Sequence, residues 1–224
     1  MILKWKKTGK LSIVGKLGIL FLIGLIISIP GAVSTNISGL DVLFENLDDK
    51  LRIVLLVVII ISSLLSIVVM LLLQAPFYLS QHYVYLKVVK EEKLEIKDAF
   101  YGFKFYKKAV VLYLKMFLII MGGFLLFIIP GIILLYKYQM SFYLLCENPN
   151  LSTKECLKQS SDITAGYKSD LFLMDLSFIG WDLLAILTFG ILYIWLTPYK
   201  IASHAAAYLD LNPSKLIKEE AQHI

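Results

Sequence analysis

Two aspartates lie within the long apolar runs of the C-terminal third of this chain. Asp175 and Asp182 are seven residues apart, so a continuous helix would carry both on one face, two turns apart. A carboxylate in such a segment is costly unless a partner compensates its charge, and this pattern predicts a site for a proton or a cation. We expect the partner to be His204, His82 or Lys115. The alternative is that Asp175 lies near the end of its segment and that Asp182 is protonated or hydrogen-bonded to a neighbouring segment.

The two histidines occupy matching places. His82 follows Pro76 by six residues, and His204 follows Pro198 by six residues. Two histidines and two aspartates could hold a divalent metal, but no HExxH or similar spacing supports this, so we expect no metal and no cofactor. The chain also lacks a GxSxG motif, a P-loop and a glycine-rich dinucleotide fingerprint, which argues against an enzyme.

The elements that must position these residues are apolar and long. Between Lys115 and Lys137 the sequence carries no charged residue. Over the whole chain the mean hydropathy is +0.76, and only 17% of residues are charged. A helix needs about 20 predominantly apolar residues to cross a bilayer. The sequence therefore predicts an all-α, polytopic transmembrane helical bundle, with one membrane domain over residues 1–211 and a cytoplasmic tail over 212–224.

The apolar runs divide into spans by length. The 38 residues from 109 to 146 are too long for one crossing and favour two helices joined at Pro130-Gly131, and Phe189-Gly190 divides the last run in the same way. Four spans is the alternative. The N-terminus could also be a cleaved signal peptide, but we expect it to be an uncleaved first span. The prediction is six spans in three hairpins, at about 11–33, 52–79, 109–129, 131–146, 170–189 and 191–210.

The lysines predict the orientation. In the six-span arrangement all 22 basic residues except Lys50 and Arg52 lie on one side, while the loop over residues 34–51 on the other side carries four acidic residues. Short cytoplasmic loops are enriched in Lys and Arg. We therefore expect both termini in the cytoplasm, at the cell membrane. This topology also explains the net charge of +5, so no nucleic acid partner is expected.

Two segments between the spans resemble each other. Residues 94–99 (LEIKDA) align with residues 151–156 (LSTKEC) at an offset of 57. The second begins with Ser152 and Glu155 in the spacing of a capping box. The first is amphipathic and is expected to lie on the inner membrane surface. Its apolar face carries Ile96, Ala99, Phe100, Phe103 and Tyr106. We interpret the chain as three repeats of about 60 residues.

Several lysines lie close to the predicted cytoplasmic ends of spans. Lys115, Lys137 and Lys200 are expected to reach the headgroup region, where they are candidate contacts for anionic lipids. The expected partners are membrane lipids and other membrane proteins. The two cysteines, Cys146 and Cys156, have no metal-site spacing and are expected to be reduced and structural.

Several motifs carry a family resemblance. They are residues 176–181 (LSFIGW), 187–191 (LTFGI), 195–199 (WLTPY), 129–132 (IPGI) and 147–149 (ENP). They resemble the bacterial integral-membrane family described as domain of unknown function 975. The resemblance implies a polytopic cytoplasmic-membrane protein, chiefly of Gram-positive bacteria, and it assigns no activity and no catalytic residue.

The function we expect is non-enzymatic: envelope lipid handling, or an accessory role in a membrane complex. One alternative is an ion-coupled secondary transporter that uses Asp175 and Asp182, since repeats and midplane carboxylates are typical of that class. Another is a self-immunity protein against a membrane-active peptide, for which a small basic polytopic protein would be sufficient.

Overall fold

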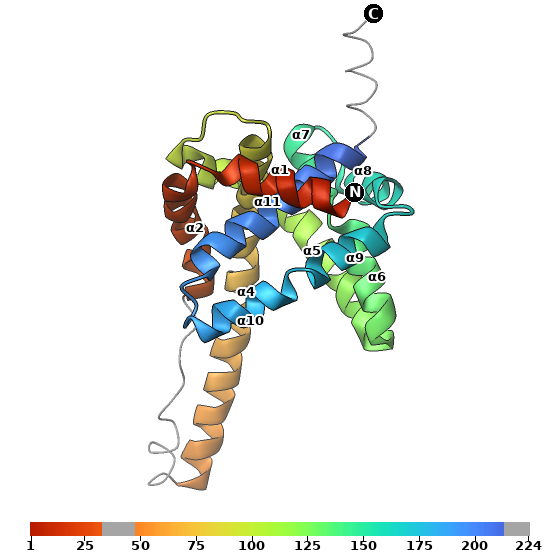
Figure 1. The fold of residues 1–224 in the computed structure, drawn as a ribbon. Helices are drawn as coiled ribbons and strands as arrows, with labels where there is room; N and C mark the ends of the chain where they lie inside the picture. The colour runs from red at the N-terminus through yellow and green to blue at the C-terminus, as the bar shows by residue number, and fades with distance from the viewer. Residues whose placement is uncertain (33–47, 213–224) are drawn as a thin grey trace, which may run out of the picture.

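The structure, a computed structural model, describes residues 1–32 and 48–212. All regular elements within these residues are helices, as the composition predicts, and no strand occurs among them (Figure 1). Most of the loop expected outside the cell, residues 34–51, and most of the expected C-terminal tail, residues 212–224, lie outside the described residues. The helices are α1 (Ile2–Ile13), α2 (Leu17–Ala32), α4 (Asp49–Val89), the 3-10 helix η1 (Ile96–Phe105), α5 (Tyr106–Leu126), α6 (Ile128–Tyr138), α7 (Ser141–Glu147), α8 (Thr153–Ile163), α9 (Lys168–Leu176), α10 (Ile179–Leu187) and α11 (Tyr193–Leu211).

Three helical stretches among the described residues are long and apolar enough to cross a membrane. They are Asp49–Val89, Ile96–Leu126 and Ile128–Glu147, and the pair α1 and α2 would make a fourth if it is one broken span. Length and composition therefore identify three or four candidate crossings among the described residues, fewer than the six expected from the sequence. Residues 168–211 account for much of the difference, because α9 and α10 have only nine residues each.

The longest helix is α4, with 41 residues. Pro76 lies inside it without ending it. The half that follows Ala75 packs against η1, α2 and α11, and its buried residues include Leu79, Val84 and Val88. The other half is apolar and exposed, and it extends well beyond the other helices (Figure 1). Aliphatic side chains over such a length favour contact with lipid hydrocarbon.

The helix is interrupted near the start of the first predicted span, residues 11–33. Helix α1 ends at Ile13, Gly15 has a positive φ of 75°, and the axis turns by 96° before α2 continues. Helix α1 packs along α11 through Trp5, Gly9 and Ile13, which are spaced four residues apart and are buried. A Cβ atom at Gly9 would lie 2.6 Å from the Ser203 backbone nitrogen, so glycine permits this close approach. Figure 1 shows α1 lying across the end of the molecule opposite to the free end of α4.

The chain breaks between α5 and α6, but three residues before the predicted turn at Pro130-Gly131. Phe127 is the extended residue, with φ −163° and ψ 158°. Pro130 lies in the first turn of α6, where its missing N–H has no helical acceptor in any case. Gly123 and Gly131 face each other, and a Cβ at Gly123 would lie 3.0 Å from the Gly131 Cα. Helices α5 and α6 therefore pack closely at their shared end.

The predicted span 170–189 differs most from the structure. It is broken at Ser177 and Phe178 into α9 and α10, so Asp175 and Asp182 do not lie on one continuous helix. The turn predicted at Phe189-Gly190 is present, because both residues have positive φ values, 51° and 85°, before α11 begins.

The two similar segments begin alike. In α8, Ser152 and Glu155 form the predicted capping box, with the Glu155 N–H 3.3 Å from the Ser152 hydroxyl and the Ser152 N–H 2.7 Å from the Glu155 carboxylate. In η1, the Glu95 N–H donates to the Asp98 carboxylate at 2.9 Å. This segment is a 3-10 helix. Of the five apolar residues expected on its membrane-facing side, Ile96, Phe100, Phe103 and Tyr106 are exposed, whereas Ala99 is buried.

Candidate functional site

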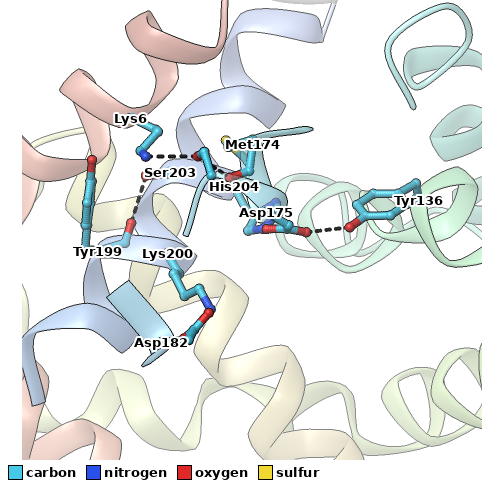
Figure 2. Close-up of polar contacts among 10 residues, drawn as sticks. Lys6, Tyr136, Met174, Asp175, Asp182, Tyr199, Lys200, Ser203 and His204 are labelled. Atoms are coloured by element: carbon cyan, nitrogen blue, oxygen red, sulfur yellow. Dashed lines mark hydrogen bonds and ion pairs between the residues drawn. The ribbon is translucent and has the colours of Figure 1, made fainter. Parts of the chain in front are cut away.

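Asp175 joins three helices. From α9, its carboxylate accepts a hydrogen bond from the Tyr136 hydroxyl of α6 at 2.8 Å and lies 2.7 Å from Nε2 of His204 on α11 (Figure 2). His204 is one of the partners expected from the sequence. The side chains of Asp175 and His204 are 33% and 21% exposed, so solvent screens this pair only in part. The contact can hold a proton between a carboxylate and an imidazole.

Asp182 has a different partner. From α10 it forms an ion pair with Lys200 of α11, whose Nζ lies 2.9 Å and 2.7 Å from the two carboxylate oxygens (Figure 2). Lys200 was expected to reach the lipid headgroups, and in the structure it instead compensates this carboxylate. Lys200 and His204 are four residues apart on α11 and therefore share a face. Helix α11 thus supplies a nitrogen partner to each of the two aspartates.

The break between α9 and α10 is packed against α1. Lys6 donates to the Ser177 hydroxyl at 2.9 Å, and its Nζ lies 4.2 Å from the centre of the Phe178 ring. The Lys200 Nζ lies 5.8 Å from the same ring. Phe178 is fully buried. Two lysines near one aromatic face stabilise this break by cation–π contacts.

His82 lies elsewhere. Its Nδ1 lies 2.8 Å from the Tyr78 carbonyl one turn earlier on α4, and its ring is packed among Tyr78, Phe142 and Tyr143. The structure does not bring His82 to either aspartate. Across residues 1–32 and 48–212, no three His, Cys, Asp or Glu side chains gather closely enough to hold a metal ion.

The remaining predicted lysines have partners within the chain. The Lys115 Nζ donates to the Thr153 hydroxyl at 2.7 Å and so connects α5 to the start of α8. The Lys137 Nζ lies 5.3 Å from the centre of the Tyr138 ring. Neither lysine approaches Asp175 or Asp182 through a described contact.

A second polar cluster was missed by the sequence reasoning. Glu147, at the end of α7, accepts hydrogen bonds from Lys90 at 2.6 Å, the Tyr208 hydroxyl at 2.7 Å and the Asn212 amide at 3.2 Å. These residues border a cleft of about 1100 Å³ between the ends of α4, α8 and α11. Two signals could have found the cluster: Glu147 belongs to the ENP motif, and Lys90 precedes it by 57 residues, the offset of the repeat.

Both cysteines are free and buried. Burial raises the pKa of the Cys156 thiol to about 11. A thiol with such a pKa is protonated at neutral pH and reacts slowly, because the thiolate is the nucleophile. A structural role for Cys156, at the first turn of α8, follows from this environment.

The described fold and its paired charges are those of an all-helical protein with segments suited to a membrane. Residues 114–215 match the model of the family described as Protein of unknown function (DUF975), which supports the family resemblance of the sequence motifs. The match begins at residue 114, so it includes both aspartates and Glu147. Comparisons with curated proteins and with solved structures found no match.

Proposed function

We propose that this chain is a non-enzymatic, multi-pass protein of the cytoplasmic membrane that binds lipids of the inner leaflet. It acts in envelope lipid handling or as an accessory of a membrane complex. The observation that carries the proposal is the 96° bend between a basic helix, α1, and an apolar helix, α2. If α2 enters the bilayer, α1 lies along its surface.

The composition of α1 fits a membrane surface. The helix has four lysines and no acidic residue. One face packs on α11, while Leu3, Lys7, Lys10 and Leu11 are exposed. Exposed leucines would enter the headgroup boundary, and lysines beside them would attract anionic lipids. The exposed aromatic side chains of η1, Phe100 and Phe103, provide a second apolar surface of this kind.

The topology within this proposal keeps an even number of crossings. Helices α2 and α4 form one pair, α5 and the run of α6 with α7 form the second, and α9 with α10 returns through α11 as the third. The third pair enters the membrane through a broken helix. Both termini then lie in the cytoplasm, on the side where lysines are most frequent.

The proposal is tested by the lipids that accompany the purified full-length chain. We expect anionic lipids to be enriched relative to the membrane extract, measured by mass spectrometry after mild solubilisation. Replacing Lys7 and Lys10 with Gln should reduce the enrichment by roughly thirtyfold, since each lysine near an anionic surface contributes about 1 kcal/mol. The same change at Lys154 and Lys158, which lie on the polar helix α8, is the matched control. A lipid profile equal to that of the bulk extract would contradict the proposal.

A specific observation favours a second candidate, an ion-coupled transporter. Broken helices that carry ionisable residues are typical of secondary transporters, and the break at Ser177-Phe178 lies between Asp175 and Asp182. Replacing Asp182 with Asn should then abolish proton-dependent flux in vesicles. Flux that is unchanged by this substitution removes the transporter hypothesis.

A further inference from the structure

A second cavity of about 420 Å³ lies between α2, α4 and α11. It shares no residue with the polar contacts labelled in Figure 2. Its inner wall contains the buried side chains Leu20, Ile23 and Val84, and its rim contains exposed apolar side chains, among them Leu25 and Ile194. The cavity therefore has an apolar interior that continues into an apolar outer surface.

An apolar ligand fits this cavity better than water does. Protein interiors are packed to the density of organic crystals, and voids of this size are few. Water occupies a cavity stably only where each molecule finds two to four polar partners, and the walls here are chiefly aliphatic and aromatic. In the proposed topology the rim, at Leu25 and Ile194, faces lipid hydrocarbon, so flexible acyl chains are the molecules present at the opening.

We propose that this cavity binds an acyl chain of a membrane glycerolipid. The inference rests on the proposed function and adds to it the place where the protein holds its lipid. A cavity of about 420 Å³ falls within the range of pockets that enclose small molecules. Because the lining residues Leu25 and Ile194 are exposed at the outer surface, one acyl chain can enter from the bilayer while the headgroup remains at the membrane surface.

The polar groups at the cavity indicate the direction in which the bound acyl chain runs. Gln74 and Gln81 are seven residues apart on α4, and both line the cavity. Gln81 lies nearer the end of α4 that carries Lys87 and Lys90, which is the polar end of the molecule. Its amide can donate to the ester carbonyl of a glycerolipid whose chain extends toward Gln74. A small number of precisely placed polar groups in an apolar pocket usually fixes the orientation of a ligand.

Two glycines of α2 allow a matched test. Gly24 lines the cavity, and a Cβ atom added there meets no atom within 4 Å. Gly18 is equally open but does not line the cavity. The probe is a phosphatidylglycerol with a photoactivatable diazirine in one acyl chain, reconstituted with the full-length protein. The labelled peptides are identified by mass spectrometry for the wild type, Gly24→Trp, Gly24→Leu and Gly18→Trp.

The wild type should be labelled on α2 near Leu25 and on α11 near Ile194. Gly24→Trp should reduce this label by about tenfold, the effect expected when about two methylene groups lose their contacts. Gly24→Leu should reduce it less, and Gly18→Trp should retain it. Label that persists in both Gly24 variants, or that spreads evenly along the exposed half of α4, overturns the inference. Failure of the inner-leaflet proposal is separate, because it is read from the Lys7 and Lys10 variants and leaves this labelling pattern unchanged.

Discussion

At the scale of residues, three acidic side chains of the described residues each have a partner that compensates the carboxylate. Asp175 is held by Tyr136 and His204, Asp182 by Lys200, and Glu147 by residues of α4 and α11. The sequence was sufficient to select the two aspartates, because acidic residues in apolar runs are rare. It named His204 among three possible partners but did not foresee Lys200 as the partner of Asp182, because that contact depends on a helix break that the apolar pattern does not reveal.

Removal of the Asp175 carboxylate should destabilise the fold. Asp175→Ala leaves the Tyr136 hydroxyl and His204 without their acceptor, and we expect the free energy of unfolding to fall by about 2 kcal/mol, since each hydrogen bond contributes about 1 kcal/mol. Tyr136→Phe should cost about 1 kcal/mol. The measurement is thermal unfolding in detergent, with Tyr113→Phe on α5 as the control for loss of a hydroxyl. An Asp175→Ala protein as stable as the wild type would show that the contact contributes little.

Glu147 should be more sensitive than its exposed neighbour Glu92. Glu147→Ala removes the acceptor of Lys90, which is partly exposed, and of the Tyr208 hydroxyl, whose residue is buried, and should lower the free energy of unfolding by about 2 kcal/mol. Glu92→Ala, at the rim of the same cleft, should change it by less than about 0.5 kcal/mol. Denaturant or thermal unfolding of both variants gives the comparison. Equal effects would mean that the Glu147 cluster is not a stabilising centre.

At the scale of elements, the helical character and most apolar segments follow from composition, whereas the breaks do not. The turn at Phe189-Gly190 was predicted correctly because glycine readily adopts a positive φ. The break before α6 was misplaced because proline tolerates the first turn of a helix as well as a turn. The 3-10 geometry of η1 is set by its packing on α4, which no local pattern predicts.

The contact between η1 and α4 depends on Gly102. Its N–H donates to the Ser80 hydroxyl at 2.8 Å, and a Cβ atom at this position would lie 1.9 Å from the Pro76 carbonyl oxygen. Gly102→Ala should therefore push η1 away from α4 and destabilise the protein by about 3 kcal/mol, as overpacking does. Thermal unfolding and proteolysis between residues 90 and 105 report the effect.

Gly122→Ala is the control for this substitution. Gly122 lies within α5, and a Cβ atom there meets nothing within 4 Å. This change should leave stability unaltered or raise it by about 0.5 kcal/mol, because alanine favours a helix over glycine. If both alanine variants behaved alike, the close approach of η1 to α4 would not be a determinant of stability.

At the scale of the whole molecule, the sequence predicted a membrane protein and its family, while the number of crossings was harder to obtain. By length and composition, α4 and the runs that end in α5 and α7 are long and apolar enough to cross a membrane. The first and fifth predicted spans are interrupted, by the 96° bend between α1 and α2 and by the break between the nine-residue helices α9 and α10. Hydropathy measures the apolar content of a segment and not the direction of its axis.

The orientation can be tested with engineered thiols in intact cells. The native Cys156 is unsuited to this, because it is buried and its pKa is raised to about 11, so it is protonated at neutral pH and becomes reactive only toward high pH. Lys158→Cys places a thiol on the exposed side of α8. An impermeant maleimide should label it only after the cells are permeabilised, whereas Glu45→Cys, in the loop predicted to face outward, should react without that step. Labelling of Lys158→Cys from outside would contradict the proposed topology.

The packing of α1 on α11 has a consequence for synthesis. The Trp5 indole donates to the Asp210 carboxylate at 2.8 Å, and Lys4 forms an ion pair with the same residue. Helix α1 thus finds this neighbour only after about 205 further residues have been translated. Until α11 is made, the face of α1 that packs on it stays uncovered by that helix, so a nascent chain halted before α11 would expose the buried side chains Trp5 and Ile13.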